Sequence, residues 1–382
     1  MRGLPMAHPE KQKYMLYNNM MFTVAAHLVE VKTGQPFENV LKEKIFKPLG
    51  MTSTFLHAPF AQAWTDRMAL GHQFDKASGD YNAFAIPYCP EAKGAGSIVT
   101  SSADYIKWVQ AMLHRREPIS ESSFKALTQP RILIEPADDG PDPFCSHQLY
   151  CLGWETYHYR GHQVVIHEGL IDGFGSSHFF LPAHGFGAVI LGNADGIEQV
   201  CWILARELID AALDVPGAER PNWAALQAAK VAAGGDAGNP EDQLQEVRTE
   251  LSSGERPEKP APPLETLIGT YSDIGYGVFK VEIRDGSLFI DALDRGYQCT
   301  LTFEHVRTWE ETDESGTVIT RSSMVAHIRS LRASPDEYLA AEFVFAAGSG
   351  GQSVAGQAVR MAIALDPDTG TIWFDRTDKE DV

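Results

Sequence analysis

Two short polar stretches of the sequence carry side chains that could do chemistry. Tyr17 and Asn19 form a Tyr-x-Asn pattern directly ahead of an apolar helical stretch, and His167 opens the run His-Glu-Gly much later in the chain. A phenol and an imidazole can each accept or donate a proton, and a side-chain amide can hold a carbonyl group. The residue types therefore suit proton-transfer catalysis. Taken alone, polar residues ahead of a helix are also typical of an ordinary helix cap.

Other catalytic and metal-binding motifs do not account for these residues. The run His167-Glu168-Gly169 resembles the start of a zinc-protease motif, but the second histidine of that motif is missing. His158 and His162 flank a glycine turn, and no carboxylate is placed to complete a metal site with them. The sequence contains no Gly-x-Ser-x-Gly, Walker or dinucleotide-binding glycine pattern. We therefore expect neither a metal nor a cofactor.

Composition limits the class of protein. The chain has 382 residues, of which 44% are hydrophobic and 22% charged, values typical of soluble globular domains. Its length favours two domains, or one large domain and a small one. No apolar run is long enough to span a bilayer, and residues 1–14 lack the apolar core of a secretory signal. The sequence thus predicts a cytoplasmic protein without a membrane partner.

Charge and cysteine usage exclude further classes of protein. The net charge of −19 opposes binding to nucleic acid or anionic lipid, because both need clustered lysine and arginine. The five cysteines, an odd number without a Cys-x-x-Cys pair, indicate neither a disulfide framework nor a zinc ribbon. We expect buried or half-buried free thiols at Cys89, Cys145, Cys151, Cys201 and Cys299.

Hydrophobic periodicity predicts helices in the first part of the chain and strands after Cys151. Helices are expected over residues 20–33, 36–50, 102–113 and 198–214. The third is expected to be capped within Ser102–Asp104, and the last, apolar on most sides, to be well buried and to close the domain. Four short strand-like runs within residues 152–196, separated by Gly, Pro and Asn, are typical of antiparallel strands joined by tight turns.

The composition changes again after residue 213. Residues 214–263 predict a surface helix followed by a stiff Pro-rich linker, GERPEKPAPP. Residues 264–382 alternate apolar and polar side chains, with turn signals such as Asp285-Gly286, which predicts a small all-β barrel or sandwich. Residues 346–356 are expected to form a hairpin loop.

The combination of motifs is more specific than its parts. The Tyr-x-Asn pattern, GAGSIVTSSADYIKWVQAML at residues 94–113 and the His-Glu-Gly strand region at residues 161–196 resemble the serine β-lactamase and penicillin-binding-protein-like hydrolases, in their class C and esterase branch. The resemblance implies an α+β domain over residues 1–213, an antiparallel sheet with helices that is incomplete at its N-terminal side. The tail resembles the lipocalin-like barrel that many such hydrolases carry after a linker.

The resemblance also implies roles for particular residues. Tyr17 matches the phenol that takes the proton of a serine nucleophile, and Asn19 the amide that holds the substrate carbonyl. His167 matches the group, in place of the family's Lys-Thr-Gly lysine, that steadies the tyrosine proton. Gly169 and Leu170 match the backbone that lines the oxyanion site. Glu168 is expected to point away, because successive strand residues face opposite sides.

One departure from the family pattern is serious. The family's Ser-x-x-Lys nucleophile lies upstream of the tyrosine motif, and residues 1–16 contain no serine. Ser122 and Lys125 form such a pattern downstream, which we interpret as a chance match on a surface helix. We therefore expect a chain that begins within a longer hydrolase and is inactive alone. The alternatives are a shortened relative that serves as a binding or regulatory module, and a scaffold whose site-like residues are coincidental caps.

The resemblance implies an acyl-enzyme hydrolase or acyltransferase whose partner is a small-molecule ester, lactam or peptide. The loops that line the pocket choose among these substrates, so the motifs do not identify one. An incomplete sheet would leave an apolar strand at residues 186–193 unpaired, and such an edge favours self-association.

Overall fold

The computed structural model describes residues 14–75, 78–86, 88–134, 140–233, 240–254, 256–295, 298–312, 316–330, 336–345, 356–366 and 370–377. The chain separates into two compact units, of which one is Gln12–Ala233 and the other contains Gly234–Val382. The loop predicted at residues 346–356 lies, except for Gly356, outside the described residues.

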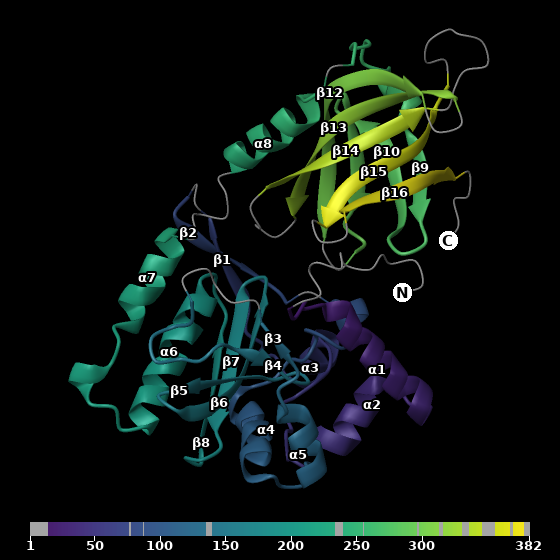
Figure 1. Cartoon of the computed structure of the whole chain (residues 1–382). Helices are drawn as coiled ribbons and strands as arrows, with labels where there is room; N and C mark the ends of the chain where they lie inside the picture. Colours follow the sequence, from purple (N-terminus) through teal and green to yellow (C-terminus); the bar gives the residue numbers. More distant parts are fainter. Residues whose placement is uncertain are drawn as a thin grey trace. The chain divides into compact units, whose positions relative to one another are not determined.

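The first unit is built on an antiparallel sheet with the strand order β3-β4-β5-β6-β7-β8 (Figure 1). Its strands are β3 (Ile132–Leu133), β4 (Leu149–Tyr150), β5 (Glu155–Tyr159), β6 (His162–Ile171), β7 (Phe174–Leu181) and β8 (Phe186–Gly192). A separate hairpin is formed by β1 (Gly71–Asp75) and β2 (Asp80–Phe84). The four strands predicted within residues 152–196 are confirmed as β5 to β8. β8 lies at one edge of the described sheet, as predicted, while self-association stays a prediction.

Helices cover both faces of this sheet. The helices of the unit are α1 (Asn19–Thr33), α2 (Phe37–Leu41) with a π-helical turn (Lys42–Phe46), α3 (Ala58–Trp64), α4 (Ser102–His114), α5 (Glu121–Thr128), α6 (Ile197–Ala212) and α7 (Trp223–Ala233), with 3-10 turns at Pro90–Ala92 and Gly217–Glu219. Val165 and Phe180 pack with α4, whereas Val164 and Ile166 pack with α6. This alternation along β6 is what a strand buried on both faces requires.

Two predictions about these helices need correction. The N-cap of α4 is Ser101, one residue before the predicted cap, and its side chain accepts a hydrogen bond from the backbone N–H of Asp104. The helix α6 was expected to be well buried, but Val200, Leu204 and Leu208 are exposed. The reason is that α6 packs on the sheet with one face, so an apolar stripe remains on the other.

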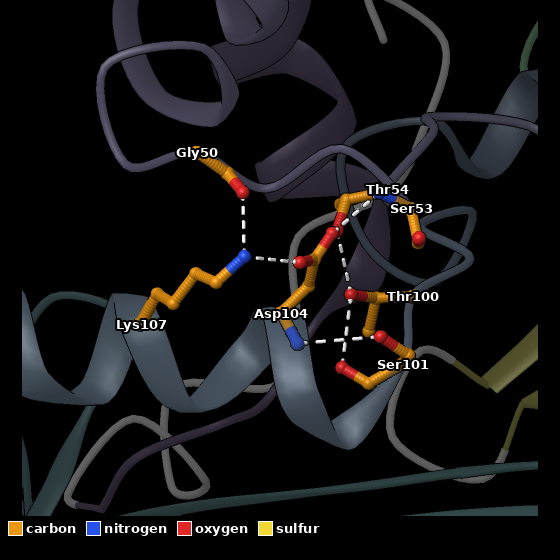
Figure 2. Close-up of polar contacts among 7 residues, drawn as sticks. All are labelled: Gly50, Ser53, Thr54, Thr100, Ser101, Asp104 and Lys107. Atoms are coloured by element: carbon orange, nitrogen blue, oxygen red, sulfur yellow. Dashed lines mark hydrogen bonds and ion pairs between the residues drawn. The ribbon is translucent and has the colours of Figure 1, made fainter.

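A buried carboxylate fixes the start of α4. Asp104 accepts hydrogen bonds from the backbone N–H of Ser53 and the hydroxyl of Thr54, and forms an ion pair with Lys107 at 2.7 Å (Figure 2). Lys107 also donates to the carbonyl of Gly50. Burial raises the pKa of Asp104, but these donors outweigh burial and hold that pKa below its ordinary value. The loop at residues 50–54 and the first turn of α4 are therefore held together.

A second buried carboxylate holds α7. Asp210, on α6, is fully buried and accepts hydrogen bonds from the hydroxyl of Tyr159 at 2.6 Å and the indole N–H of Trp223 at 2.7 Å. Because the α7 residue Trp223 is itself buried in the core beside α6, this helix belongs to the first unit. Among the described residues between 214 and 263 there are thus two α-helices, α7 and α8 (Pro240–Ser252), where one surface helix was predicted.

The second unit is a closed antiparallel barrel with the strand order β10-β11-β12-β13-β14-β15-β16-β9 (Figure 1). Its strands are β9 (Gly269–Asp273), β10 (Gly277–Arg284), β11 (Ser287–Ala292), β12 (Cys299–Thr312), β13 (Val318–Ser330), β14 (Glu337–Phe345), β15 (Ala358–Asp366) and β16 (Gly370–Thr377), preceded by a 3-10 turn at Leu264–Thr266. Apolar side chains, among them Tyr271, Phe343 and Phe374, form its core. The predicted turn at Asp285-Gly286 joins β10 to β11, with positive φ at both residues.

The helix α8 packs on β12, β13 and β14 of this barrel. The predicted free thiols are confirmed at Cys145, Cys151, Cys201 and Cys299, of which the last three are buried, while Cys89 is half-buried. Among the helices of the described residues, none combines the length and the apolar character needed to cross a membrane.

Candidate active site

Tyr17 lies directly ahead of α1 and is not the residue that caps this helix. Asn18 is the N-cap, and its side chain accepts a hydrogen bond from the backbone N–H of Met21 at 3.2 Å. Tyr17, which is 48% exposed, and Asn19, which is also exposed, are therefore not needed for capping. Their side chains stand at the start of α1 and are accessible to a ligand.

The structure brings Tyr17 and His167 together. Their ring centroids lie 6.2 Å apart, and the ring of Tyr150 lies 6.3 Å from Tyr17 and 6.1 Å from His167. Phe22, on the first turn of α1, completes the group at 5.8 Å from Tyr17. Two residues that were singled out far apart in the sequence thus meet in one aromatic cluster.

The proton on His167 can be placed by its hydrogen bond. Nδ1 of His167 lies 2.7 Å from the carbonyl oxygen of Glu168. A carbonyl oxygen can only accept, so Nδ1 carries the hydrogen and Nε2 of the neutral ring is an acceptor. Burial lowers the pKa of His167 and favours this neutral form, although the same hydrogen bond raises the pKa in part.

His167 is the first residue of β6 beyond the segment that pairs with β5. The strand β5 pairs with β6 only as far as Ile166, whereas β7 pairs with it as far as Ile171. Gly169 and Leu170 follow in this segment. The Leu170 side chain is 61% exposed, and a Cβ atom at Gly169 would lie 2.8 Å from the hydroxyl oxygen of Ser176.

Glu168 belongs to the opposite face of β6. An open hollow of about 240 Å³ beside it is lined by Glu168, Gly169, Leu170 and Ser176 of the sheet and by Glu198 and Cys201 of α6. Burial raises the pKa of Glu168. The strand alternation therefore separates Glu168 from the cluster of Tyr17 and His167.

Sequence reasoning missed two residues that act on Tyr17. Tyr150 and Glu155 are cross-strand partners on β4 and β5, and Glu155 accepts a hydrogen bond from the side chain of Gln148. Burial and the charge of Glu168 raise the pKa of Glu155 to about 7. Burial, and then the charge of Glu155, raise the pKa of Tyr17. No motif marks Glu155, because its effect depends on packing rather than on spacing.

The helix α1 is held by contacts with the glycine-rich turn after residue 92, both at its start and near its end. A Cβ atom at Gly94 would lie 2.2 Å from the carbonyl oxygen of Phe22, so the two backbones touch. Lys93 forms an ion pair of 2.6 Å with Glu30 of α1, and this pair lowers the pKa of Glu30 to about 2. Ahead of Tyr17, the N–H of Met15 donates to the carbonyl of Leu133 on β3.

The other candidates of the sequence lie elsewhere. Ser122 and Lys125 are exposed on α5, where Lys125 forms an ion pair with Glu121. His162 contacts His184, with 2.9 Å between ring nitrogens, while His167 faces Tyr17. Over the part of the chain that the structure describes, no three His, Cys, Asp or Glu side chains gather as a metal site requires.

Comparison with known proteins gives a family and several relatives. A family model described as Beta-lactamase matches residues 1–208. An unguisins hydrolase, ungD, of Aspergillus violaceofuscus is 32% identical over 330 residues, which cover 80% of this chain and 57% of the relative. A D-aminopeptidase of Gluconobacter oxydans is 26% identical over 200 residues, which cover 52% of this chain and 35% of the relative.

Among solved structures, an octameric penicillin-binding protein homologue from Pyrococcus abyssi is similar to this chain. The similarity covers 94% of this chain and 65% of the homologue's chain. The sequence identity is 17% and the TM-score 0.45. The chain spans about half the length of the first curated relatives that it matches.

Proposed function

The chain belongs to the Beta-lactamase family, and on that premise we propose that Tyr17, Asn19 and His167 form one wall of a serine acyl-enzyme site. The observation that carries the proposal is the meeting of the Tyr17 and His167 rings at 6.2 Å beside the one-sided segment of β6. The cytoplasmic location stays a prediction from the sequence.

The proposed reaction is hydrolysis of an amide or ester bond in a small molecule or peptide. The names of two relatives, an unguisins hydrolase and a D-aminopeptidase, support this substrate class. In the first step a serine oxygen bonds to the acyl carbon, its proton passes to a base, and the amine or alcohol leaves with a proton. Water then cleaves the acyl-serine bond and restores the hydroxyl.

Each proposed residue has one role in these steps. Tyr17 exchanges the proton, His167 accepts a hydrogen bond from the phenol through Nε2, and Asn19 holds the substrate carbonyl. The backbone N–H of Leu170 donates to the developing oxyanion, and Gly169 lines the site beside it.

The protonation state of Tyr17 bears on whether this chain acts alone. A tyrosine can serve as a base when a neighbouring cation lowers its pKa. Here burial and a carboxylate raise the pKa of Tyr17, so the phenol keeps its proton at neutral pH. The family's Ser-x-x-Lys, which would supply both nucleophile and cation, has no match in residues 1–16. We therefore propose that the 382-residue chain alone does not turn over an ester or amide substrate.

Labelling by a fluorophosphonate tests both parts of this proposal. We expect no labelling of the 382-residue chain, and labelling at the serine of a Ser-x-x-Lys motif in a form extended by the in-frame coding sequence ahead of Met1. In that form Tyr17→Phe should slow acylation by roughly 10²- to 10⁴-fold, the usual contribution of a positioned base. The matched control is Glu168→Gln on the opposite face of β6, which should change the rate little.

Two outcomes would contradict the proposal. Robust labelling of the 382-residue chain that Ser122→Ala abolishes would place the nucleophile on α5. An effect of Glu168→Gln that exceeds that of Tyr17→Phe would show that the faces of β6 are assigned wrongly.

The alternative of a binding module is favoured by the raised pKa of Tyr17, since a neutral phenol and a neutral imidazole can hold a ligand without catalysis. An extended form that binds D-amino-acid peptides in calorimetry and remains unlabelled would support this alternative.

A further inference from the structure

A second histidine lies directly behind His167. His178, on β7, is the cross-strand partner of His167 on β6, so both side chains leave the sheet on the same face. Their rings are stacked, with centroids 6.2 Å apart and planes inclined by 25°. One side of the His167 ring therefore contacts Tyr17 and Tyr150, and another contacts His178.

The ring of His178 is fixed by two aromatic neighbours. The Trp154 ring meets it edge-on at 5.0 Å and the Tyr105 ring at 4.9 Å. The hydroxyl of Tyr105 lies 3.4 Å from Nε2 of His178. Tyr105 follows Asp104, whose hydrogen bonds hold the start of α4 (Figure 2). The orientation of His178 is thus determined by the fold rather than by solvent.

The surroundings of His178 favour its neutral form. Burial, and then the proximity of His167, lower the pKa of His178 to about 3. A charge on either ring would have to be accommodated beside the other ring and among aromatic neighbours. His178 therefore has no part as a base at neutral pH, and its contribution must come from shape and contact.

We propose that His178 is a positioning residue, which holds the His167 ring toward Tyr17 in its Nδ1–H form and excludes water from the sheet side of that ring. The assignment of His167 to an active site rests on the proposed function. The contact between the rings of His167 and His178 does not depend on the proposed function.

Other titratable groups face His167 and must be considered in any titration. Tyr17 lies on the side of α1 and Tyr150 on β4, and burial raises the pKa of both phenols, which are therefore neutral below pH 9. Glu155 acts on Tyr17 and has its pKa raised to about 7. A titration of His167 should accordingly be measured in Glu155→Gln as well, so that the ionisation of Glu155 is not mistaken for it.

Long-range ¹H–¹⁵N spectra of the imidazoles test the proposal on the 382-residue chain. The signals of His167 are assigned by comparison with His167→Gln. In the parent chain we expect His167 to titrate below its ordinary value of about 6.5 and to show the Nδ1–H form. His178→Ala should admit water and raise the pKa of His167 by on the order of one unit, with a mixture of both tautomers. His178→Phe, which keeps a ring in place, should stay close to the parent.

A matched control removes an imidazole that does not contact His167. His184→Ala, at an exposed position that contacts His162, should leave the His167 signals unchanged. If His178→Ala only lowered the melting temperature and left the pKa and tautomer of His167 as in the parent, the proposal would be wrong and His178 would be a core residue. Should the alanine variant not fold, the same criterion applies to His178→Asn.

These spectra need no turnover, so the two proposals can fail separately. An extended form that is never labelled would remove the acyl-enzyme function and leave the His167–His178 result standing. Labelling of the extended form, together with an unchanged pKa and tautomer of His167 in His178→Ala, would support the acyl-enzyme function and remove the positioning role of His178.

Discussion

At the scale of single residues, environment decides what each ionisable group of the first unit can do. His167 and His178 are the same residue type on the same face of one sheet, yet their surroundings differ. The ring of His167 lies beside Tyr17, whereas the ring of His178 lies against Trp154 and Tyr105. Glu155 and Asp104 are both carboxylates held by side-chain donors, but burial and the charge of Glu168 raise the pKa of Glu155, whereas Lys107 and the other donors lower that of Asp104. The sequence shows none of these differences.

The raised pKa of Glu155 predicts how stability depends on pH. The folded state holds the proton up to about pH 7, whereas a carboxyl in the unfolded chain loses it near its ordinary value of 4.5. Between these values the folded state binds more protons, so stability falls as pH rises through this window and levels off above it. Glu155→Gln, whose carbonyl still accepts from Gln148, should remove this loss.

Urea unfolding at pH 4 and pH 8 measures the effect. We expect Glu155→Gln to match the parent at pH 4 and to be more stable at pH 8 by on the order of 1–3 kcal/mol. Equal stability of the two proteins at both pH values would show that the pKa of Glu155 is not raised by folding.

At the scale of elements, the sequence predicts what local periodicity determines. The strands β5 to β8 follow from alternation, and the meeting of His167 with Tyr17 follows from the family resemblance. The partner of His167 was also within reach, because the turn Asp172-Gly173 joins β6 to β7 and counting outward from it pairs His167 with His178. The exposed apolar stripe on α6 was not predictable, because the sequence of a helix that is apolar on most sides does not show which of its faces packs against another element.

The contact of α1 with the glycine-rich turn gives a prediction at this scale. Gly94 has no side chain between its Cα and the backbone of Phe22, and the Cβ of an alanine would lie 2.2 Å from the Phe22 carbonyl oxygen. Gly94→Ala should therefore displace the start of α1, lower the stability by about 1–3 kcal/mol, and slow labelling of the extended form by on the order of 10- to 100-fold.

The matched control for this variant is Gly217→Ala, because a Cβ atom there meets no atom within 4 Å. It should leave both stability and labelling as in the parent. If Gly94→Ala behaved in the same way, α1 would be free to shift, and the position of Tyr17 would not depend on the turn.

At the scale of the whole molecule, the chain consists of two units that differ in how far apart in sequence their contacting elements lie. In the first, the site depends on elements far apart in sequence, α1, β4, β6 and β7, so no fragment of it contains the site. In the second, neighbouring strands are consecutive in sequence all around the barrel except where β9 closes it. Local pairing of this kind favours autonomous folding, as predicted for residues 263–382.

The structure refines where an autonomous fragment should begin. Arg307 on β12 is 5% exposed, and its guanidinium donates to the backbone carbonyls of Ser253 and Arg256, both ahead of residue 263. Arg248 of α8 adds an ion pair with Glu304 at 2.6 Å. We expect both residues 240–382 and residues 263–382 to give β-type circular dichroism spectra. The shorter fragment should be less stable by about 2–4 kcal/mol, because it leaves a largely buried guanidinium without its acceptors.

Substitution of Arg307 shows whether the lost acceptors of its guanidinium account for the lower stability of the shorter fragment. In the longer fragment Arg307→Leu removes two hydrogen bonds and should destabilise, whereas in the shorter fragment it removes a charge that has lost those partners and should be neutral or stabilising. Urea unfolding of the four proteins gives the coupling directly. An equal effect of Arg307→Leu in both fragments would mean that residues 240–262 stabilise the barrel only through the packing of α8, and random-coil spectra for both would mean that the barrel needs the first unit in order to fold.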